Sequence, residues 1–459
     1  MKTVRIAAGS GYAPSPPEPA LKLIEEGDIK YIGFDQLAEL TISILNRAKM
    51  KNPTKGYVWQ HIIDGMKMFL APAFERGITI TSNGGGANIE EAVNQVLKIG
   101  KEKGLTGLKV AQILGDDVMG RLDEIRKKGW KFKNRDTGEE DIDRIKDKIV
   151  AANVYIGSDA VVEALEEGAN VIIGGRIADS TLHVAPLIYE FGWKFEEPYW
   201  DLLNAAVTIA HIIECSDWCT GAGSVLWEDI PEYWNVGYPI AEVSEDGTAI
   251  ISKVNRTGGL LNSWTVKEHL VYEVHDPANY IMPDGIADLT TIHVEDLGDN
   301  KVRVSNMSGK PRPDTLKIQI GYLDGYITEG MIVIGAPKVL AKAKKVEEIA
   351  WEKLKKEGIT REDLDDIRID YIGLNSIFGP TLPFPPEDSI REIGMRVAVR
   401  AKTPELAEAV RFAFQMAGMV LVGWTTGGGP ARPRPVVALW TSLIPREEVP
   451  VNFKIKEVD

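Results

Sequence analysis

The sequence contains very little cysteine. Among its 459 residues only Cys215 and Cys219 are cysteines, too few for the disulfide framework that stabilises small secreted proteins. We therefore expect a reducing, cytoplasmic environment. The sequence also lacks a run of eighteen apolar residues, and no signal peptide precedes the first strand-like segment, residues 4–8. No membrane span is expected.

Positive charge is also scarce. Lys and Arg number 53 against 67 Asp and Glu, which gives a formal net charge of −14 and a sequence pI of about 5.1. This balance argues against nucleic acid as a partner, because nucleic-acid binding needs a basic face. A local basic pocket for an anionic substrate remains compatible with it. Helices dense in Lys and Glu, such as residues 342–358, give the composition a thermophilic character.

Short apolar strands that end in glycine or polar turns recur throughout the first two hundred residues. They alternate with helical segments, which predicts an α/β domain with a mostly parallel sheet flanked by helices. Beyond residue 226, hairpin patterns such as residues 240–254 predict a mainly antiparallel α+β part. We therefore expect one domain over residues 1–225 and a second over residues 226–459. The second should be β-rich over 226–336 and a helix/strand unit over 337–459.

The most informative stretch is VIIGGRIADSTLHVAPLIYEFGW, residues 171–193. Its buried strand ends at a glycine pair, and Arg176, Asp179 and His183 follow within ten residues. Open α/β sheets bind ligands beyond the carboxyl ends of their strands, so Arg176 is expected to hold an anion. Asp179 or His183 would then act as a base. The alternative is a glycine turn in which Asp179 caps a helix and His183 lies in the core.

The helix after this loop is harder to place from sequence. Asp179 or Ser180 could cap it, but Pro186 lies too deep for an unbroken helix that begins there. We therefore expect a turn first and then a helix from Pro186 to Phe191.

Other strands also end in polar or glycine-rich loops. Residues 82–88, SNGGGAN, follow a predicted strand and precede a helix, an arrangement that directs backbone N–H groups at an anion or simply forms a tight turn. Asp116 and Asp117 could anchor a substrate or metal, or cap the next helix. The residues expected along one edge of the sheet are Ser10, Asp35, Asn83, Gly84, Gly85, Gly86, Asp116, Asp117, Ser158, Asp159, Gly174, Gly175 and Arg176.

Two further segments carry candidate ligands. His211, Glu214 and Cys215 share one face of the predicted helix 202–219 and could bind a divalent metal, although their spacing matches no known zinc class. A catalytic thiol is the other possibility there, and the Thr220-Gly221 turn that follows could hold an anion. Near the C-terminus, GGGPARPRP suits a phosphate or carboxylate through Gly428 and Arg432, or forms a flexible loop with solvated arginines.

Long blocks of the sequence resemble the acyclic terpene utilisation (AtuA) family. They span nearly the whole chain, and KEHLVYEVHDPANY is the most specific of them. The resemblance implies a link to the breakdown of branched acyl-CoA intermediates, but it supplies no catalytic residues. The other matching blocks are RIAAGSGY, EPAL, SNGGGAN, LGDD, IIGGRIAD, LHVAPLIYEFGW, HIIEC, TGAG, YPIAEV, TGGL, GKPRPDTLK and GYLDGY.

Together these features favour an enzyme of the lyase class, a hydratase or dehydratase that acts on a small carboxylate or a branched acyl-CoA. Addition or removal of water beside a carbonyl needs acid/base groups and donors for an enolate, and no redox cofactor. CoA would then be part of the substrate. The alternatives are a non-catalytic subunit of an acyl-CoA carboxylase or hydratase system and a metal-dependent hydrolase. A homo-oligomer, with or without a small partner subunit, is expected. The candidate catalytic residues are Asp116, Asp179, His183 and Glu214.

Overall fold

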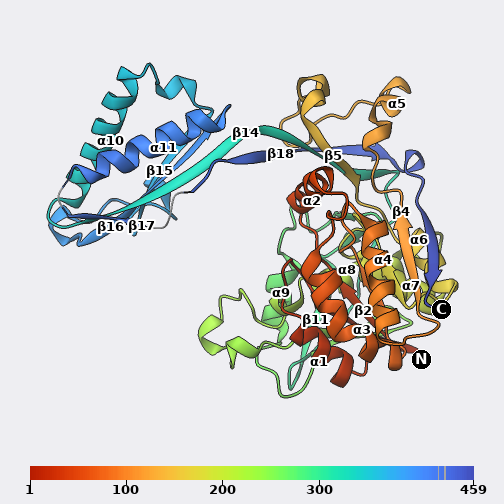
Figure 1. Ribbon diagram of the computed structural model, residues 1–459. Coiled ribbons are helices and arrows are strands. Elements are labelled where there is room, and N and C mark those ends of the chain that lie inside the picture. Colours follow the sequence, from red (N-terminus) through yellow and green to blue (C-terminus); the bar gives the residue numbers. More distant parts are fainter. Residues whose placement is uncertain (422, 428–430) are drawn as a thin grey trace. The chain divides into compact units, whose positions relative to one another are not determined.

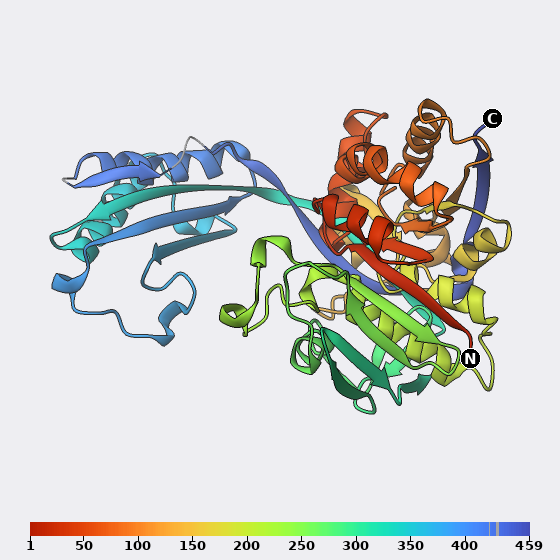
Figure 2. The same ribbon diagram turned by 90° about the horizontal axis from the view of Figure 1, so that it is seen from below.

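The structure, a computed structural model, describes residues 1–421, 423–427 and 431–459; side chains are described except at 424–427. The chain forms two compact units (Figures 1 and 2). Unit 1 comprises Met1–Tyr322 and Leu439–Asp459, and unit 2 comprises Leu323–Ala438. This division differs from the boundary expected at 225/226. The hairpin that follows residue 226 belongs to unit 1 because it extends the N-terminal sheet.

Unit 1 is built on a ten-stranded sheet whose central part is parallel, as predicted. Its strand order is β11-β12-β8-β7-β1-β2-β3-β6-β4-β19. The five parallel strands are β1 (Thr3–Ser10), β2 (Tyr31–Phe34), β3 (Thr79–Ser82), β6 (Val171–Ile173) and β4 (Lys109–Leu114). The antiparallel strands are β7 (Pro239–Ser244), β8 (Ala249–Lys253), β11 (His293–Gly298), β12 (Lys301–Ser305) and β19 (Asn452–Glu457).

Helices cover both faces of the parallel part and bury it. One layer contains α1 (Glu18–Glu26), α3 (Met66–Glu75) and α4 (Ile89–Glu102), which lie in front of the sheet in Figure 1. The other contains α6 (Asp159–Glu166), α7 (Thr181–Phe191) and α8 (Trp200–Glu214). Because every parallel strand is covered on both sides, ligands can reach it only at its ends. The remaining helices of unit 1 are α2 (Glu39–Lys51), α5 (Leu122–Lys127) and α9 (Ser263–Leu270).

Smaller antiparallel sheets complete the two units. In unit 1, β9 (Tyr280–Met282), β10 (Gly285–Asp288) and β13 (Ser308–Lys310) form a three-stranded sheet. In unit 2, β15 (Asp366–Ile372), β16 (Glu392–Ala401) and β17 (Trp424–Gly427) join the long strand β14 (Thr315–Gly335), with α10 (Val339–Lys356) and α11 (Pro404–Met419) packed on them. β18 (Arg434–Pro445) also pairs with β14. Within the described residues, no helix is long and apolar enough to cross a bilayer.

The strand that precedes Ser158 is antiparallel. The observed strand is β5 (Ile149–Val154), and it pairs with β14 in antiparallel fashion instead of joining the parallel sheet. Beyond it, Ile156 forms an isolated parallel bridge with Ile177, so Ser158 and Asp159 follow this bridge and not a strand of the parallel sheet. Asp284 accepts hydrogen bonds from the backbone N–H and the hydroxyl of Ser158, both at 2.8 Å, and Asp159 pairs with Arg312.

The helix expected to begin at Pro186 begins five residues earlier, at Thr181, so this prediction was wrong. Proline inside a helix leaves the carbonyl four residues before it without its N–H partner. Here that carbonyl belongs to Leu182, and the Thr81 hydroxyl on β3 donates to it at 2.8 Å. A side chain from the neighbouring sheet thus satisfies the carbonyl that would otherwise break the helix. Gly192 ends the helix in the left-handed conformation, as expected.

A double-mutant cycle tests whether the Thr81 hydroxyl replaces the N–H that Pro186 lacks. Thr81→Val should lower the free energy of unfolding by about 1–3 kcal/mol, because it leaves a buried carbonyl unsatisfied. The same change in a Pro186→Ala background should cost clearly less, since the alanine introduced there can donate its own N–H. Urea unfolding of the four proteins measures the coupling. Equal costs in both backgrounds would show that Thr81 does not replace the missing donor.

Candidate functional site

The carboxyl ends of β1, β2 and β3 are joined by side-chain hydrogen bonds. The Asn83 side chain donates to Asp35 Oδ1 at 2.5 Å and accepts from the backbone N–H of Gln36 at 2.7 Å. The Gln36 side chain donates to the Ser10 hydroxyl at 2.5 Å, and that hydroxyl donates to the Asp35 carbonyl at 2.8 Å. All four residues are buried. The structure thus brings Ser10, Asp35 and Asn83 together at the predicted edge.

Asp116, at the end of β4, fixes the loop that follows β6. Its Oδ2 accepts the backbone N–H of Arg176 and the side-chain amide of Asn153, both at 2.8 Å. Gly175 passes so close that a Cβ there would overlap the Asp116 carboxylate, which explains why this position is glycine. Asp116 therefore positions Arg176.

Arg176 is the centre of a buried ionic group and is only 1% exposed. Its guanidinium donates to the Leu37 carbonyl, lies 3.3 Å from Asp179 Oδ1, and stacks over the Tyr155 ring at 4.0 Å. Its Nε has no hydrogen-bond partner among the described residues. We call Asp35, Glu39, Tyr155, Arg176 and Asp179 the Arg176 cluster.

The carboxyl groups of the Arg176 cluster differ in their pKa values. Burial, and then the nearby Asp179 charge, raises the pKa of Asp35 well above its ordinary value, although Arg176 opposes this. Burial also raises the pKa of Asp179: its side chain is 31% exposed, but the oxygen that faces Arg176 is buried. Glu39 differs, because Lys317 at 3.0 Å outweighs burial and lowers its pKa to about 2. One ionised and two protonatable carboxyls therefore surround a single guanidinium.

Asp116 should also make stability depend on pH. Burial raises its pKa from 3.8 to about 6, so between these values the folded protein keeps a proton that the unfolded chain has lost. Its contribution to stability is greatest below this window and declines, by about 3 kcal/mol in total, as the pH rises through it. Asp116→Asn should remove that decline. Urea unfolding at about pH 4.5 and about pH 7 measures it, with the exposed Asp117→Asn as control. An unchanged pH dependence in Asp116→Asn would contradict the assignment.

Two predicted residues do not join the Arg176 cluster. His183 is 1% exposed, packs against Gly33 of β2, and has its pKa lowered to about 3 by burial. No described hydrogen bond or ion pair links its side chain to Asp35, Arg176 or Asp179. Asp117 is exposed, and its side chain accepts the backbone N–H of Met119 at 3.0 Å in the turn before the next helix.

The glycine-rich turns use many of their N–H groups internally. The N–H of Gly84 donates to Ser82 Oγ and that of Gly86 to the Asn83 carbonyl, while Gly85 accepts from Asn88. Gly174 donates to the Ser82 carbonyl and so ties the β6 loop to β3. These contacts hold the loops around the Arg176 cluster in place.

The remaining anion-site candidates lie elsewhere. The Thr220 hydroxyl donates to the Gly237 carbonyl at 2.7 Å, and the Gly221 N–H donates to the Trp218 carbonyl. Arg432 is exposed and belongs to unit 2, whereas the Arg176 cluster belongs to unit 1. Gly428 lies outside the described residues.

The predicted group on α8 forms a second buried polar cluster. His211 Nδ1 lies 3.0 Å from Glu214 Oε1 and 3.2 Å from the Tyr280 hydroxyl. Burial raises the pKa of Glu214 and of the Cys215 thiol, which argues against a reactive thiolate. No group of three His, Cys, Asp or Glu side chains that could hold a metal ion occurs in the described part of the chain. The arrangement therefore favours proton exchange within this cluster.

Sequence reasoning missed several residues of the site. Asp35 was expected only to line the edge, and Glu39, Tyr155, Lys317 and Tyr280 were not singled out at all. These side chains reach Arg176 or His211 from distant segments. The polar residues at the strand ends were the only local signal available.

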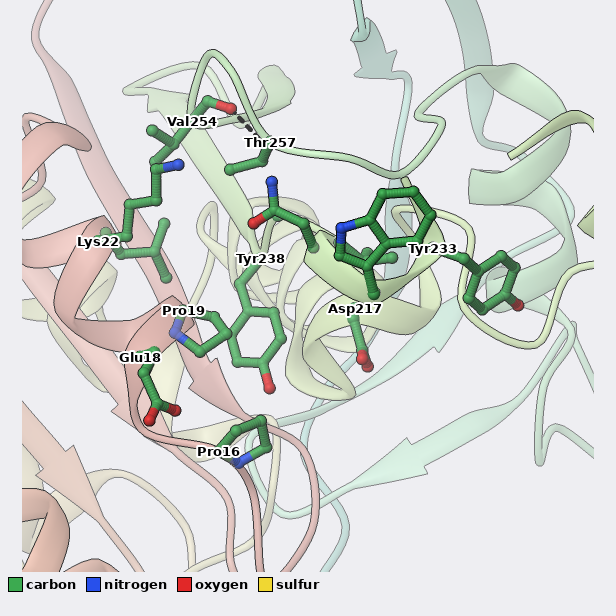
Figure 3. Close-up of a pocket in the computed structure, with 14 residues that line it drawn as sticks. Pro16, Glu18, Pro19, Lys22, Asp217, Tyr233, Tyr238, Val254 and Thr257 are labelled. Atoms are coloured by element: carbon green, nitrogen blue, oxygen red, sulfur yellow. Dashed lines mark hydrogen bonds between the residues drawn. The ribbon is translucent and has the colours of Figure 1, made fainter. Parts of the chain in front are cut away.

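A surface pocket of about 400 Å³ lies apart from these clusters (Figure 3). Its labelled side chains include Glu18 and Lys22 from α1 and Tyr238, which precedes β7. Asp217 also lines it, and burial raises the pKa of that carboxyl to about 6. None of the described candidate residues lines this pocket, so its size alone does not make it the reaction site.

Comparisons with known proteins identify one family. The model of the family described as "Acyclic terpene utilisation family protein AtuA" matches residues 4–455, which confirms the resemblance. No curated protein matches. A homoserine dehydrogenase from Thiobacillus denitrificans aligns over 92% of this chain and 84% of its own, at 9% identity and a TM-score of 0.15. So low a score supports no argument about fold or function.

Proposed function

The chain belongs to the acyclic terpene utilisation family AtuA, and we propose that it is a lyase of the hydratase/dehydratase type that acts on a small carboxylate or a branched acyl-CoA. The observation that chiefly supports this is the buried Arg176 guanidinium with Asp35 and Asp179 beside it, both with raised pKa values. This combination offers one fixed positive charge and two groups that can exchange protons.

Arg176 would bind the substrate's carboxylate, or the enolate oxygen that develops on a thioester. A guanidinium held by Leu37, Asp179 and Tyr155 cannot reorient, so it is preorganised for developing negative charge. Its Nε–H is buried and has no partner among the described residues, so it is the donor that such an oxygen would use. Asp116 acts through Arg176 and is a positioning residue.

Asp179 would remove the proton beside the carbonyl, with Asp35 as the neighbouring acid. The charge of Asp179 raises the pKa of Asp35, so an ionised Asp179 favours a protonated Asp35 beside it, which divides the roles of base and acid. Asp179 is the better placed for substrate, since its side chain is the more exposed of the two. Activity should rise with pH as Asp179 ionises, at pH values above those of an ordinary aspartate.

The proposal can be tested with a branched probe in both chemical forms. Purified protein would be incubated with β-hydroxyisovalerate and with β-hydroxyisovaleryl-CoA, and loss of water would be followed by mass spectrometry. We expect turnover of one form, a fall of about 10²-fold or more in kcat for Asp179→Asn, and little change for Asp117→Asn. The Asp117 variant is a matched control because it carries the same substitution on an exposed side chain.

A negative result would also be informative. If neither probe turns over and neither raises the melting temperature, the lyase proposal fails, because a ligand of the folded state must stabilise it. The non-catalytic subunit would then be the better explanation, and a co-purifying protein would be the next thing to seek. If turnover occurs but Asp179→Asn retains it, the reaction belongs to another site.

A further inference from the structure

Three rings from separate elements meet beside Glu214. His211 lies between His269 of α9 and Tyr280 of β9, with ring centroids 5.4 Å and 4.7 Å away. His269 donates its Nε2–H to the His211 carbonyl at 2.9 Å, which fixes its orientation. Burial, and then the His211 charge, lowers the pKa of His269 to about 3, so His269 is neutral. It supports His211 without exchanging protons.

Two hydrogen-bond partners compete for His211 Nδ1. His211 Nδ1 is within hydrogen-bond distance of both Glu214 Oε1 and the Tyr280 hydroxyl, and a single ring nitrogen cannot serve two donors or two acceptors at once. If Nδ1 carries its hydrogen and donates to Glu214, the Tyr280 O–H is free to donate elsewhere. If Glu214 carries the proton, Nδ1 accepts it. A proton can therefore move among three atoms with little movement of the side chains.

Two buried polar atoms of the group have no hydrogen-bond partner among the described residues. Glu214 is 8% exposed and His211 is 2% exposed, yet Glu214 Oε2 and His211 Nε2 have no hydrogen-bond partner within the described residues. Buried polar atoms are rarely left unpaired, so such atoms mark a place for a ligand or water.

The group also feels the charges of the Arg176 cluster. The charge of Asp179 acts on both Glu214 and Tyr280, and the charge of Asp35 reaches Cys215, the residue after Glu214. The other titratable groups that act on Tyr280 are Cys215 and Glu273. The two groups are therefore coupled electrostatically. One contains the Arg176 guanidinium and carboxyls, and the other contains a phenol, an imidazole and a carboxyl.

From this geometry we infer that Tyr280, His211 and Glu214 form a proton relay that protonates the leaving hydroxyl while Asp179 removes the α-proton. This rests on the proposed lyase function. The Cα–H bond breaks and its proton goes to the Asp179 carboxylate. The electron pair forms the C=C bond as the C–O bond breaks, and the Tyr280 proton joins the departing hydroxide to form water. Glu214, through His211, returns a proton to the phenolate. Asp179 releases its proton to solvent and Glu214 takes one up from solvent, which restores both carboxyl groups for the next turnover.

The relay predicts that two half-reactions depend on different residues. Exchange of the α-proton needs Arg176 and Asp179, whereas loss of water also needs Tyr280. Isovaleryl-CoA has no hydroxyl to lose, so its α-proton exchange in D₂O reports the first step alone. Tyr280→Phe should lower kcat for dehydration of β-hydroxyisovaleryl-CoA by about 10²–10⁴-fold and leave α-proton exchange within about twofold.

Tyr272→Phe is the matched control. Its ring stacks on His269, but its hydroxyl is not bonded to His211. It should change neither reaction. Glu214→Gln should lower dehydration and remove the effect of this carboxyl from the pH profile of kcat. A merely structural role of Glu214 would lower kcat without changing that profile.

A spectroscopic measurement separates failure of the relay from failure of the proposed function. In protein labelled with ¹⁵N-histidine, the His211 Nδ1 resonance should shift in both Tyr280→Phe and Glu214→Gln, and not in Tyr272→Phe. Normal dehydration by Tyr280→Phe would overturn the relay and leave the lyase proposal standing. If the wild type has neither activity, the lyase proposal fails, and the resonance then tests only the hydrogen-bond chain: a position unchanged in both variants overturns the chain as well, and a shift in both keeps it.

Discussion

Arg176→Met should lower the free energy of unfolding by about 3–5 kcal/mol near neutral pH and abolish binding of the carboxylate probe. Methionine keeps most of the apolar volume but removes the donor to the Leu37 carbonyl and the cation beside Asp179. The destabilisation comes mainly from carboxyls left buried without a counter-charge, since removing one partner of a buried pair costs more than the pair itself contributes. Urea unfolding and isothermal titration with β-hydroxyisovalerate measure the two effects.

The loss of unfolding free energy in Arg176→Met should also increase with pH. Arg176 lowers the pKa of Asp35 and of Asp179, so removing it raises both further. A carboxyl whose pKa is higher in the folded state destabilises that state increasingly as the pH rises from its unfolded value to its folded value. The difference between Arg176→Met and wild type should therefore be smaller at about pH 5 than at about pH 8.

Arg176→Lys provides the matched control for this prediction. It keeps the charge but loses the planar contact with Tyr155 and the fixed set of donors, so stability should recover in part while probe binding stays weak. If Arg176→Met were equally destabilising at both pH values, its cost would be one of packing and the electrostatic explanation would fail.

Gly33→Ala is expected to destabilise the protein through a clash in its core. A Cβ at Gly33 would overlap the imidazole of His183, which is fully enclosed between α7 and the sheet. Overpacking of this kind costs about 1–3 kcal/mol. His183→Ala should also destabilise, through the cavity it leaves. In the double variant the new methyl group enters that cavity, so the combined loss should be smaller than the sum of the two.

This cycle also decides what His183 does. If His183 has only a packing role, the kcat of His183→Ala should equal that of the wild type when both are assayed below the melting temperature of the variant. A loss of kcat of about 10²-fold, with the fold intact by circular dichroism, would instead restore His183 as the base. Thermal unfolding and the dehydration assay on the same four proteins give both answers.

Local patterning was enough to predict the central sheet and the edge where polar residues gather. The apolar β-branched run that ends at the glycine pair located β6, and strand ends in a parallel sheet must share one edge. That reasoning placed Ser10, Asn83 and Asp116 correctly relative to Arg176. It did not find that β5, the strand before Ser158, pairs with β14, and that Ile156 beyond it forms an isolated parallel bridge with Ile177.

The rest depends on contacts between distant segments. The sequence around Pro186 does not predict the hydrogen bond from Thr81, more than a hundred residues earlier, to the Leu182 carbonyl. That bond keeps the helix intact. Tyr280 likewise reaches His211 across 69 residues. His183 could not be distinguished from a catalytic base by sequence, since only the position of Gly33 shows that it is enclosed.

The most direct test of the central claim is to observe the protons of Asp35 and Asp179. Infrared difference spectra of the wild type, Asp35→Asn and Asp179→Asn over a pH series detect the C=O stretch of a protonated carboxyl. We predict a protonated-carboxyl band that persists well above the pH at which exposed aspartates ionise and that either substitution removes or shifts. Loss of that band at ordinary aspartate pH, with no effect of either substitution, would show two plain carboxylates beside Arg176 and would contradict an acid/base role for the site.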